Sequence, residues 1–307
     1  MSNMLQYSVW SNCCNQCDFC LRAERIPYSK EKQLRRLDRI KKNLDYIDWA
    51  GKYSGGISLL GGELYYTTDE DLQKSFLELV DLIIEKVLKK STNPLVKYST
   101  VTNGMYDPTF LFKVLDKLSE ACGTQVIDIN FSFDLKYRYH QEGQKEQVIK
   151  NVNLVHDRYN YKVGIQMILT QHLIDLWKSG VDVIKYVDDL MPDNQLAFLY
   201  PHPVHTGKNL DDFFFKRTDL FPFLTWLKNI YPNEYLSFMH STKNSATYKW
   251  TGLKDILSDD IEEQPQLTDG KEEITECGHS VLYRCYADSN KCLLCDLYSF
   301  DEEVYYG

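Results

Sequence analysis

Three cysteines close to the start of the chain, Cys13, Cys17 and Cys20, follow the spacing C-x3-C-x2-C. They come directly after a short apolar and aromatic run that includes Tyr7 and Trp10. Thiolates are the usual ligands of iron–sulfur clusters, and a four-iron cluster ordinarily takes four of them. Because only three are offered at this spacing, one iron would stay open to an outside ligand, which is what distinguishes a reactive metal site from a structural one.

Two other interpretations of this cysteine group stay open. A zinc site would need a fourth ligand, which Cys14 or a distant residue could supply, and the thiols could also be reduced and inert. Cys14 could in addition replace Cys13 as a ligand, which would give a C-x2-C-x2-C triplet. The spacing favours Cys13.

A second motif, Gly61-Gly62-Glu63, follows the apolar run 57–60. Glycines let the backbone approach a ligand closely, and a carboxylate supplies an acceptor for an ammonium group. The motif lies about forty residues beyond the cysteines, and the aromatic Phe19 directly precedes the last of them. Together these features resemble the radical S-adenosylmethionine (SAM) superfamily.

The resemblance implies a 4Fe–4S cluster on the three cysteines, with SAM bound to the open iron through its amino and carboxylate groups. One-electron reduction would then cleave SAM to methionine and a 5′-deoxyadenosyl radical, which abstracts hydrogen from a substrate. The electron would come from a reductase or a ferredoxin- or flavodoxin-type protein. In the family, the Gly-Gly-Glu segment follows the second barrel strand and holds the SAM amino group.

Strand-like and helix-like segments alternate along the first two thirds of the chain. The expected strands cover residues 5–10, 56–60, 96–102, 126–133, 163–170 and 196–200, and helices between them include 30–47, 70–88 and 107–118. Such repeats predict parallel strands in a barrel or an open α/β sheet. The family uses a six-repeat version of the TIM barrel. The expected fold is therefore α/β, a partial (β/α)6 TIM barrel over residues 1–205 with a C-terminal cysteine-rich extension over residues 206–307.

Active sites in parallel barrels lie at the carboxyl ends of the strands. Relatives contact the SAM ribose and carboxylate at the ends of strands four and five, and an aromatic residue beside the last cysteine covers the cluster or adenine. For each candidate, strand capping or core packing is the alternative. The cofactor-binding candidates outside the Gly-Gly-Glu segment are Phe19, Thr102, Asn103, Ser132, Asp134 and Gln166.

A second cysteine group lies near the end of the chain, around a predicted hairpin over residues 281–297. It partly resembles the SPASM or twitch extensions that hold auxiliary iron–sulfur clusters in many radical SAM enzymes. A second 4Fe–4S cluster is one occupant; zinc is another, because four-cysteine zinc sites are common, and His279 could replace one ligand. Free thiols are the third interpretation. The expected metal ligands are Cys277, Cys285, Cys292 and Cys295.

Composition and charge indicate which partners and which cellular compartment to expect. The chain has 307 residues and a net charge of −9, which argues against nucleic acid because that affinity depends on Lys and Arg contacts to phosphates. No apolar run reaches the roughly 18–20 residues of a membrane span, and the start lacks a signal-peptide pattern. The nine cysteines do not follow a secreted disulfide framework, so a reducing cytoplasm is expected.

Three functions fit these features. The first is radical SAM modification of a peptide or protein side chain, since auxiliary-cluster extensions are common in enzymes of that group. The second is a radical SAM enzyme that acts on a small molecule or nucleotide. The third is a non-catalytic zinc-binding module, which leaves the Gly-Gly-Glu segment unexplained.

Overall fold

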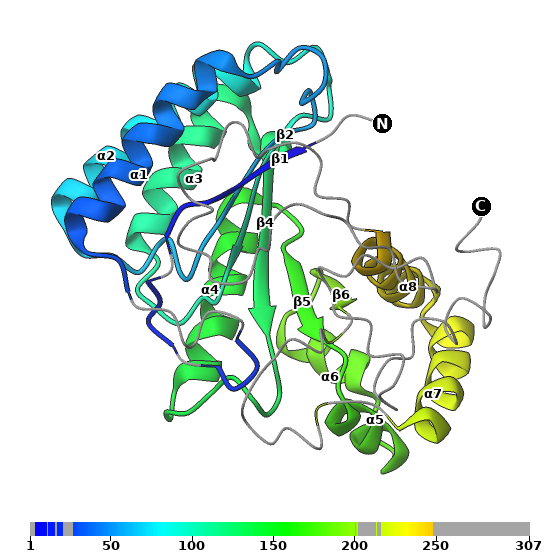
Figure 1. The fold of residues 1–307 in the computed structure, drawn as a ribbon. Coiled ribbons are helices and arrows are strands. Elements are labelled where there is room, and N and C mark those ends of the chain that lie inside the picture. Colours follow the sequence, from blue (N-terminus) through cyan, green and yellow to red (C-terminus); the bar gives the residue numbers. More distant parts are fainter. Residues whose placement is uncertain are drawn as a thin grey trace, which may run out of the picture. The chain divides into compact units, whose positions relative to one another are not determined.

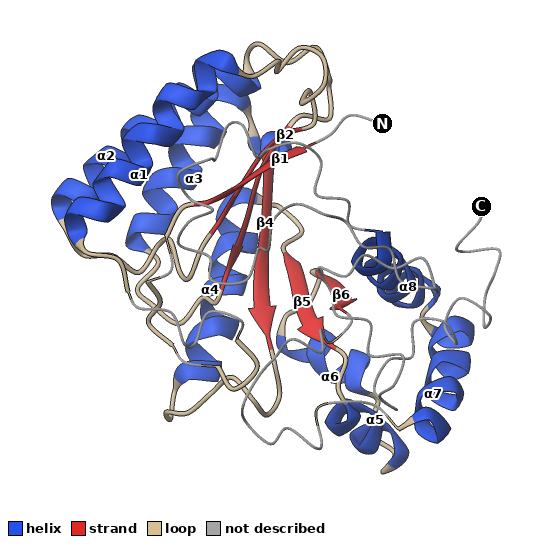
Figure 2. Ribbon diagram, in the orientation of Figure 1, coloured by secondary structure: helices blue, strands red, loops and turns tan. Residues whose placement is uncertain are grey.

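The computed structural model describes residues 4–10, 12–15, 17–20, 27–199, 201, 213 and 216–247. Six strands form one parallel sheet in which neighbours in space are neighbours in the chain. Figure 2 shows the strands among the helices. The alternation predicted from the sequence is confirmed. The strands are β1 (Met4–Ser8), β2 (Gly56–Leu60), β3 (Lys97–Thr102), β4 (Ile127–Phe133), β5 (Gly164–Ile168) and β6 (Gln195–Leu199).

A helix of 14 to 16 residues follows each of the first four strands. The expected helices over 30–47 and 70–88 are confirmed, each ending in a short 3-10 or π turn, whereas the third helix begins two residues later than expected and extends further. The helices are α1 (Lys30–Asn43), α2 (Glu70–Ile83), α3 (Thr109–Cys122), α4 (Gln144–Tyr159), α5 (Gln171–Lys178), α6 (Val183–Leu190), α7 (Arg217–Ile230) and α8 (Pro232–Thr247). The short turns are η1 (Leu44–Tyr46), η2 (Ile84–Leu88) and η3 (Thr124–Val126).

Side-chain caps fix where the first two helices start. The Ser29 side chain accepts a hydrogen bond from the backbone N–H of Lys32 at 3.3 Å, and Asp69 accepts one from Leu72 at 3.1 Å. Such caps satisfy backbone donors that have no partner within the helix. They fix where the chain that leaves β1 and β2 begins its helix.

One face of strands β1–β4 is apolar and buried. Figure 1 shows helices α1, α2 and α3 together on one side of these strands. Because parallel strands in register place paired residues on the same face, each row of neighbours shares one environment. The two buried rows are, in strand order, Leu5, Ile57, Tyr98 and Ile127, and then Tyr7, Leu59, Thr100 and Ile129.

The intervening row on the opposite face is polar. It runs in register through Gln6, Ser58, Ser99 and Asp128, and the Ser99 hydroxyl donates to the Asp128 carboxylate at 2.7 Å. The sheet therefore has one face that packs against helices and one that carries polar side chains.

The chain divides into two compact units, each described by itself. The first contains residues 1–166 and 184–196, and the second contains residues 167–183 and those from 197 onward. In the second unit an aromatic cluster joins α5 to α7, where the Trp177 ring lies 5.5 Å from Phe223 and 5.7 Å from Trp226.

Several predictions for the second half of the chain lie outside the described residues. They are the domain boundary at residue 205, the hairpin over 281–297 and the C-terminal cysteines. Helix α7 carries several aromatic residues, and α8 is a helix that the sequence did not indicate. Across the described residues, no helix combines the length and apolar character needed to cross a membrane.

Candidate active site

The loop that carries the cysteines is joined to the Gly-Gly-Glu segment by backbone hydrogen bonds. The N–H of Gly62 donates to the Trp10 carbonyl at 2.8 Å, and the N–H of Glu63 donates to the Asn12 carbonyl at 2.7 Å. The Trp10 indole N–H also donates to the Glu63 carbonyl at 3.0 Å. These bonds extend the pairing of β1 and β2 beyond the strand ends, so the two motifs start side by side.

Gly61 is required by this close approach. A Cβ atom at this position would lie 2.9 Å from the Trp10 carbonyl oxygen and 2.5 Å from the Leu64 side chain. A larger residue would therefore push the Gly-Gly-Glu segment away from the start of the cysteine loop. Gly61 and Gly62 are only half-buried, so their backbone stays accessible to a ligand.

Two further contacts hold the ends of the cysteine loop. Arg36 on α1 donates from Nε to the Val9 carbonyl at 2.6 Å and from Nη2 to the Ser8 carbonyl, which anchors the chain as it leaves β1. Asn12 and Tyr28 exchange two hydrogen bonds, at 3.0 Å and 2.9 Å. The sequence alone assigned no role to these residues.

The Glu63 carboxylate is completely buried and its hydrogen bonds come from the protein itself. The Thr102 hydroxyl lies 2.9 Å from both carboxylate oxygens, the Asn103 N–H donates at 2.6 Å and the Tyr65 N–H at 3.2 Å. The Tyr106 hydroxyl lies 2.6 Å from that of Thr102. Burial raises the pKa of Glu63 to about 7, although these hydrogen bonds oppose the shift.

Glu63 thus ties the segment after β2 to the end of β3. Since the carboxylate has no exposed surface, its role in this structure is to position the segment. A ligand bound at Gly61-Gly62-Glu63 would therefore contact the half-buried backbone of the two glycines.

Asn103 connects this buried carboxylate to the cysteine sulfurs. Its backbone N–H binds Glu63, and its side-chain amide nitrogen lies 3.5 Å from Cys13 Sγ and 3.4 Å from Cys14 Sγ. The amide oxygen accepts a hydrogen bond from the Met105 N–H at 2.9 Å, which fixes the orientation of the side chain. Asn103, predicted to bind the cofactor, thus contacts both Glu63 and the cysteine sulfurs.

The two neighbouring thiols differ in acidity. A hydrogen bond between them raises the pKa of Cys13 and lowers the pKa of Cys14. Burial opposes ionisation of both, and the Asn103 amide favours the ionised form of Cys14. Cys14 is therefore the member of the pair that ionises first.

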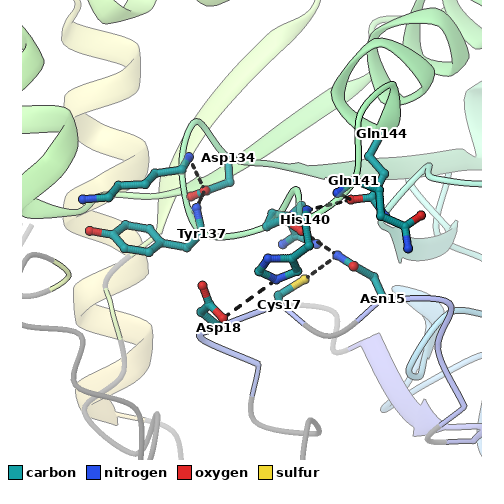
Figure 3. Close-up of polar contacts among 10 residues, drawn as sticks. Asn15, Cys17, Asp18, Asp134, Tyr137, His140, Gln141 and Gln144 are labelled. Carbon is teal, nitrogen blue, oxygen red and sulfur yellow. Dashed lines mark hydrogen bonds and ion pairs between the residues drawn. The ribbon is translucent and has the colours of Figure 1, made fainter.

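A second side-chain amide, that of Asn15, is hydrogen-bonded to Cys17. Figure 3 shows the Asn15 side chain beside the Cys17 sulfur, with a nitrogen–sulfur distance of 3.1 Å, and the same nitrogen donates to the Arg138 carbonyl at 2.8 Å. Cys17 is buried, and burial raises the pKa of its thiol to about 11. The charges of Cys20 and Cys13 also act on Cys17 and raise its pKa further.

The chain that leaves β4 closes over the cysteine loop (Figure 3). Asp134, expected to contact a cofactor, is buried and accepts hydrogen bonds from the N–H groups of Lys136, at 2.7 Å, and Tyr137. The Tyr137 carbonyl then accepts one from the Asp18 N–H at 3.1 Å, and the Asp18 carboxylate lies 3.8 Å from His140 Nε2. Asp134 thereby fixes the shape of the turn that is hydrogen-bonded to the cysteine loop.

Arg138 on this turn is a residue that the sequence did not indicate. Only 8% of its surface is exposed, and its guanidinium lies 5.1 Å from the centre of the buried Phe19 ring. Within the described part of the chain, Arg138 Nε is a buried donor that has no hydrogen-bond partner. Because buried polar groups are almost always paired, this one indicates a place for an anionic group beside the cysteine loop.

The remaining candidates are not brought into this network. Ser132 on β4 and Gln166 on β5 are half-buried, and neither forms a hydrogen bond to the cysteine loop or to Glu63 among the described residues. The expected ligands of the second metal site all lie outside the described residues; they are Cys277, Cys285, Cys292 and Cys295.

No three His, Cys, Asp or Glu side chains in the described ranges lie close enough to bind a single metal ion. A four-iron cluster attaches each thiolate to a different iron, so its ligand sulfurs need not converge on one point. Comparison of the chain with protein-family models finds no match, and comparison with curated proteins finds none either. The class of fold is therefore defined by the six-stranded parallel sheet alone.

Proposed function

We propose that this chain is a radical SAM enzyme built on a partial (β/α)6 barrel. The observation that supports this most is the placement of Asn103, which binds Glu63 through its backbone and the sulfurs of Cys13 and Cys14 through its amide. The two motifs that resemble the superfamily are thus parts of one hydrogen-bonded site. In the proposed enzyme the cluster ligands are Cys13, Cys17 and Cys20.

The donor set fits an iron–sulfur cluster. Cys13, Cys17 and Cys20 are free thiols, and amide N–H groups of Asn15 and Asn103 point at two of the three sulfurs. Hydrogen bonds to ligand sulfurs are a means by which proteins stabilise such clusters and set their potentials.

The surroundings also fit an amino acid-like group such as the methionine part of SAM. The half-buried backbone of Gly61 and Gly62 offers hydrogen-bond acceptors to an ammonium group, and the unpartnered Nε of Arg138 offers a charged donor to a carboxylate. When bound, the cluster and SAM supply a 5′-deoxyadenosyl radical that abstracts hydrogen. The protein holds both in place and keeps water away from the radical.

The substrate, the electron donor and the occupant of the second cysteine group follow from the resemblance alone. A peptide or protein side chain remains the first choice of substrate, and a small molecule or nucleotide the second. A second 4Fe–4S cluster or zinc at the C-terminal cysteines, and a reductase or ferredoxin- or flavodoxin-type donor in a reducing cytoplasm, complete the proposal.

Cluster assembly tests the proposal. The full chain is reconstituted anaerobically with iron and sulfide as wild type, as Cys17→Ala and as Cys122→Ala, a matched control in α3 outside the loop. Wild type and Cys122→Ala should bind the same amount, and Cys17→Ala should lose about four irons per chain. Equal iron in all three proteins would contradict the proposal. Zinc in place of iron would also contradict it and would favour a zinc-binding module.

A further inference from the structure

The polar face of the sheet carries side chains that the proposed site does not use. Ser58, Ser99 and Asp128 lie on this face in register, on β2, β3 and β4. They point away from the buried rows because successive residues of a strand face opposite sides of the sheet. Bulky branched residues dominate such inward rows in closed parallel barrels, whereas this row consists of short polar residues.

Asp128 is a half-buried carboxylate on this face. The Ser99 hydroxyl donates to one of its oxygens at 2.7 Å, and the Asn130 amide donates to the other at 3.2 Å. In the described part of the chain, no Lys, Arg or His side chain forms an ion pair with it. An ionised carboxylate can accept about four hydrogen bonds, so about two positions are left for the donors of a ligand.

The Asn130 side chain is confined between two strands. A Cβ atom at Gly164 on β5 would lie 2.0 Å from the Asn130 amide oxygen, so glycine is needed there for this side chain to fit. The nitrogen of the same amide faces Asp128. The carboxylate is thus held by donors from β3 and β4 before any ligand binds, and such preorganisation lowers the cost of binding.

The buried Ser58 hydroxyl is a second polar group on this face. Only 3% of the Ser58 surface is exposed, and its hydroxyl forms no hydrogen bond within the described residues. It lies beside Ser99 in the register of β2 and β3. Because buried polar groups are almost always paired, this hydroxyl indicates that a further polar group binds on the same face.

The next row of this face, toward the carboxyl ends of the strands, is partly apolar. Leu60 and Val101 are half-buried there, two residues along the chain from Ser58 and Ser99. The end of β3 at Thr102 lies three residues beyond Ser99, about 10 Å along the strand. A ligand that joins Asp128 to the strand ends therefore needs a cationic end and an apolar stem, which is the form of lysine and arginine side chains.

We propose that this face binds the cationic end of the substrate, an ammonium or guanidinium group, with Asp128 as its counter-ion. This inference deepens the proposed function and rests on it for the reacting centre at the strand ends. The substrate is a chain of several carbon atoms that ends in a cation, either a side chain of a peptide or a free amine. Its stem packs against Leu60 and Val101, and the net charge of −9 attracts it at long range.

Calorimetric titration of the full-length chain tests this inference. The probes are Nα-acetyl-lysine amide, its neutral counterpart Nα-acetyl-norleucine amide, and n-pentylammonium. Wild type should bind the lysine amide about 10- to 100-fold more tightly than the norleucine amide, the range expected for hydrogen bonds to a charged group. Tighter binding of the lysine amide than of pentylammonium would identify a peptide side chain, and the reverse order a free amine.

Three variants assign the preference to this face. Asp128→Asn should lose it, and Asp188→Asn, which changes an exposed carboxylate on α6, should keep it. Ser58→Ala should be as stable as wild type but bind the lysine amide about two- to tenfold more weakly, the effect of one neutral hydrogen bond. This variant decides the test if Asp128→Asn does not fold.

Three results would overturn the inference. They are equal binding of the lysine and norleucine amides by wild type, a preference that persists in Asp128→Asn, and, if that variant does not fold, unchanged binding by Ser58→Ala. Iron content, measured on the same samples after anaerobic reconstitution, tests the proposed function separately. A chain that binds no iron but keeps the Asp128-dependent preference would overturn the radical SAM assignment and leave the cation site standing.

Discussion

The backbone N–H of Asn103 lies 2.6 Å from a carboxylate oxygen of Glu63, and the side-chain amide of the same residue lies 3.5 Å from the sulfur of Cys13. A single residue at the end of β3 thus joins the segment after β2 to the loop after β1. Since parallel neighbours bring their carboxyl ends to one edge of a sheet, three consecutive strand ends build this site.

The Asn103 amide should influence the cluster that the loop is proposed to hold. Asn103→Leu removes the donor to Cys13 and Cys14 at similar size, so the reduced, more negative cluster loses stabilisation. The midpoint potential should fall by about 20–60 mV, the one-electron equivalent of about 0.5–1.5 kcal/mol for a hydrogen bond. Potentials measured by spectroscopically monitored titration check this.

Asn153→Leu is the matched control for that variant. Its amide donates to the Leu190 carbonyl at 3.3 Å, away from the cysteine loop. Its potential should equal that of wild type. An unchanged potential in Asn103→Leu, or an equal shift in both variants, would show that the amide does not act on the cluster.

Stability of the metal-free protein should depend on pH through Glu63. The folded pKa of about 7 lies above the ordinary value of 4.5, so the folded state binds more protons than the unfolded state between these values. The stabilising contribution is therefore complete below about pH 4.5 and is lost as pH rises through about 7, a change on the order of 3 kcal/mol.

Denaturant unfolding of wild type and Glu63→Gln across this pH range measures that contribution. The free energy of unfolding of wild type should fall relative to that of Glu63→Gln as the pH rises, because glutamine does not titrate. Two curves that stay parallel would mean that the carboxyl titrates normally and is not buried as described.

Thr102 should matter for stability because its hydroxyl is shared by Glu63 and Tyr106. Thr102→Val keeps the shape but leaves buried polar groups without a partner, which costs about 1–3 kcal/mol. Thr102→Ser keeps the hydroxyl and should recover most of that loss. Urea unfolding compares the three proteins; a valine variant as stable as the serine variant would rule out the hydroxyl network.

Arg138 should contribute to SAM affinity. Arg138→Leu removes the buried charged donor, and a hydrogen bond to a charged group contributes about 1.5–3 kcal/mol, so the dissociation constant of SAM should rise by roughly 10- to 100-fold. Arg158→Leu is the control, since Arg158 forms an exposed pair with Asp116. If Arg138→Leu and Arg158→Leu bound SAM with equal affinity, Arg138 would not contribute to SAM binding.

The sequence predicted the parts of this structure that repeat. The strand–helix alternation and the positions of the two motifs were readable because periodic apolar residues and glycines mark them. From parallel topology alone, Thr102 and Glu63 could be placed at one edge. The burial of Glu63 could not, because it depends on tertiary packing and on donors at the end of β3, Thr102 and Asn103, about forty residues away.

Arg138 and α8 were missed for different reasons. Arg138 stands among polar residues of a loop, and only the turn shaped by Asp134 carries it against Phe19. Helix α8 has an apolar stripe of only one turn, the buried residues Tyr235, Phe238 and Met239. The following residues 240–247 are mostly polar, so periodicity does not mark a helix of this length.

The measurement that bears most directly on the proposed chemistry is the release of 5′-deoxyadenosine from SAM. Anaerobically reconstituted full-length protein is incubated with SAM and dithionite, beside Cys17→Ala and Cys122→Ala. Wild type and Cys122→Ala should release 5′-deoxyadenosine and methionine in equal amounts, and Cys17→Ala should release neither. No release from a wild type that carries iron, or equal release from Cys17→Ala, would contradict the assignment of this site to radical SAM chemistry.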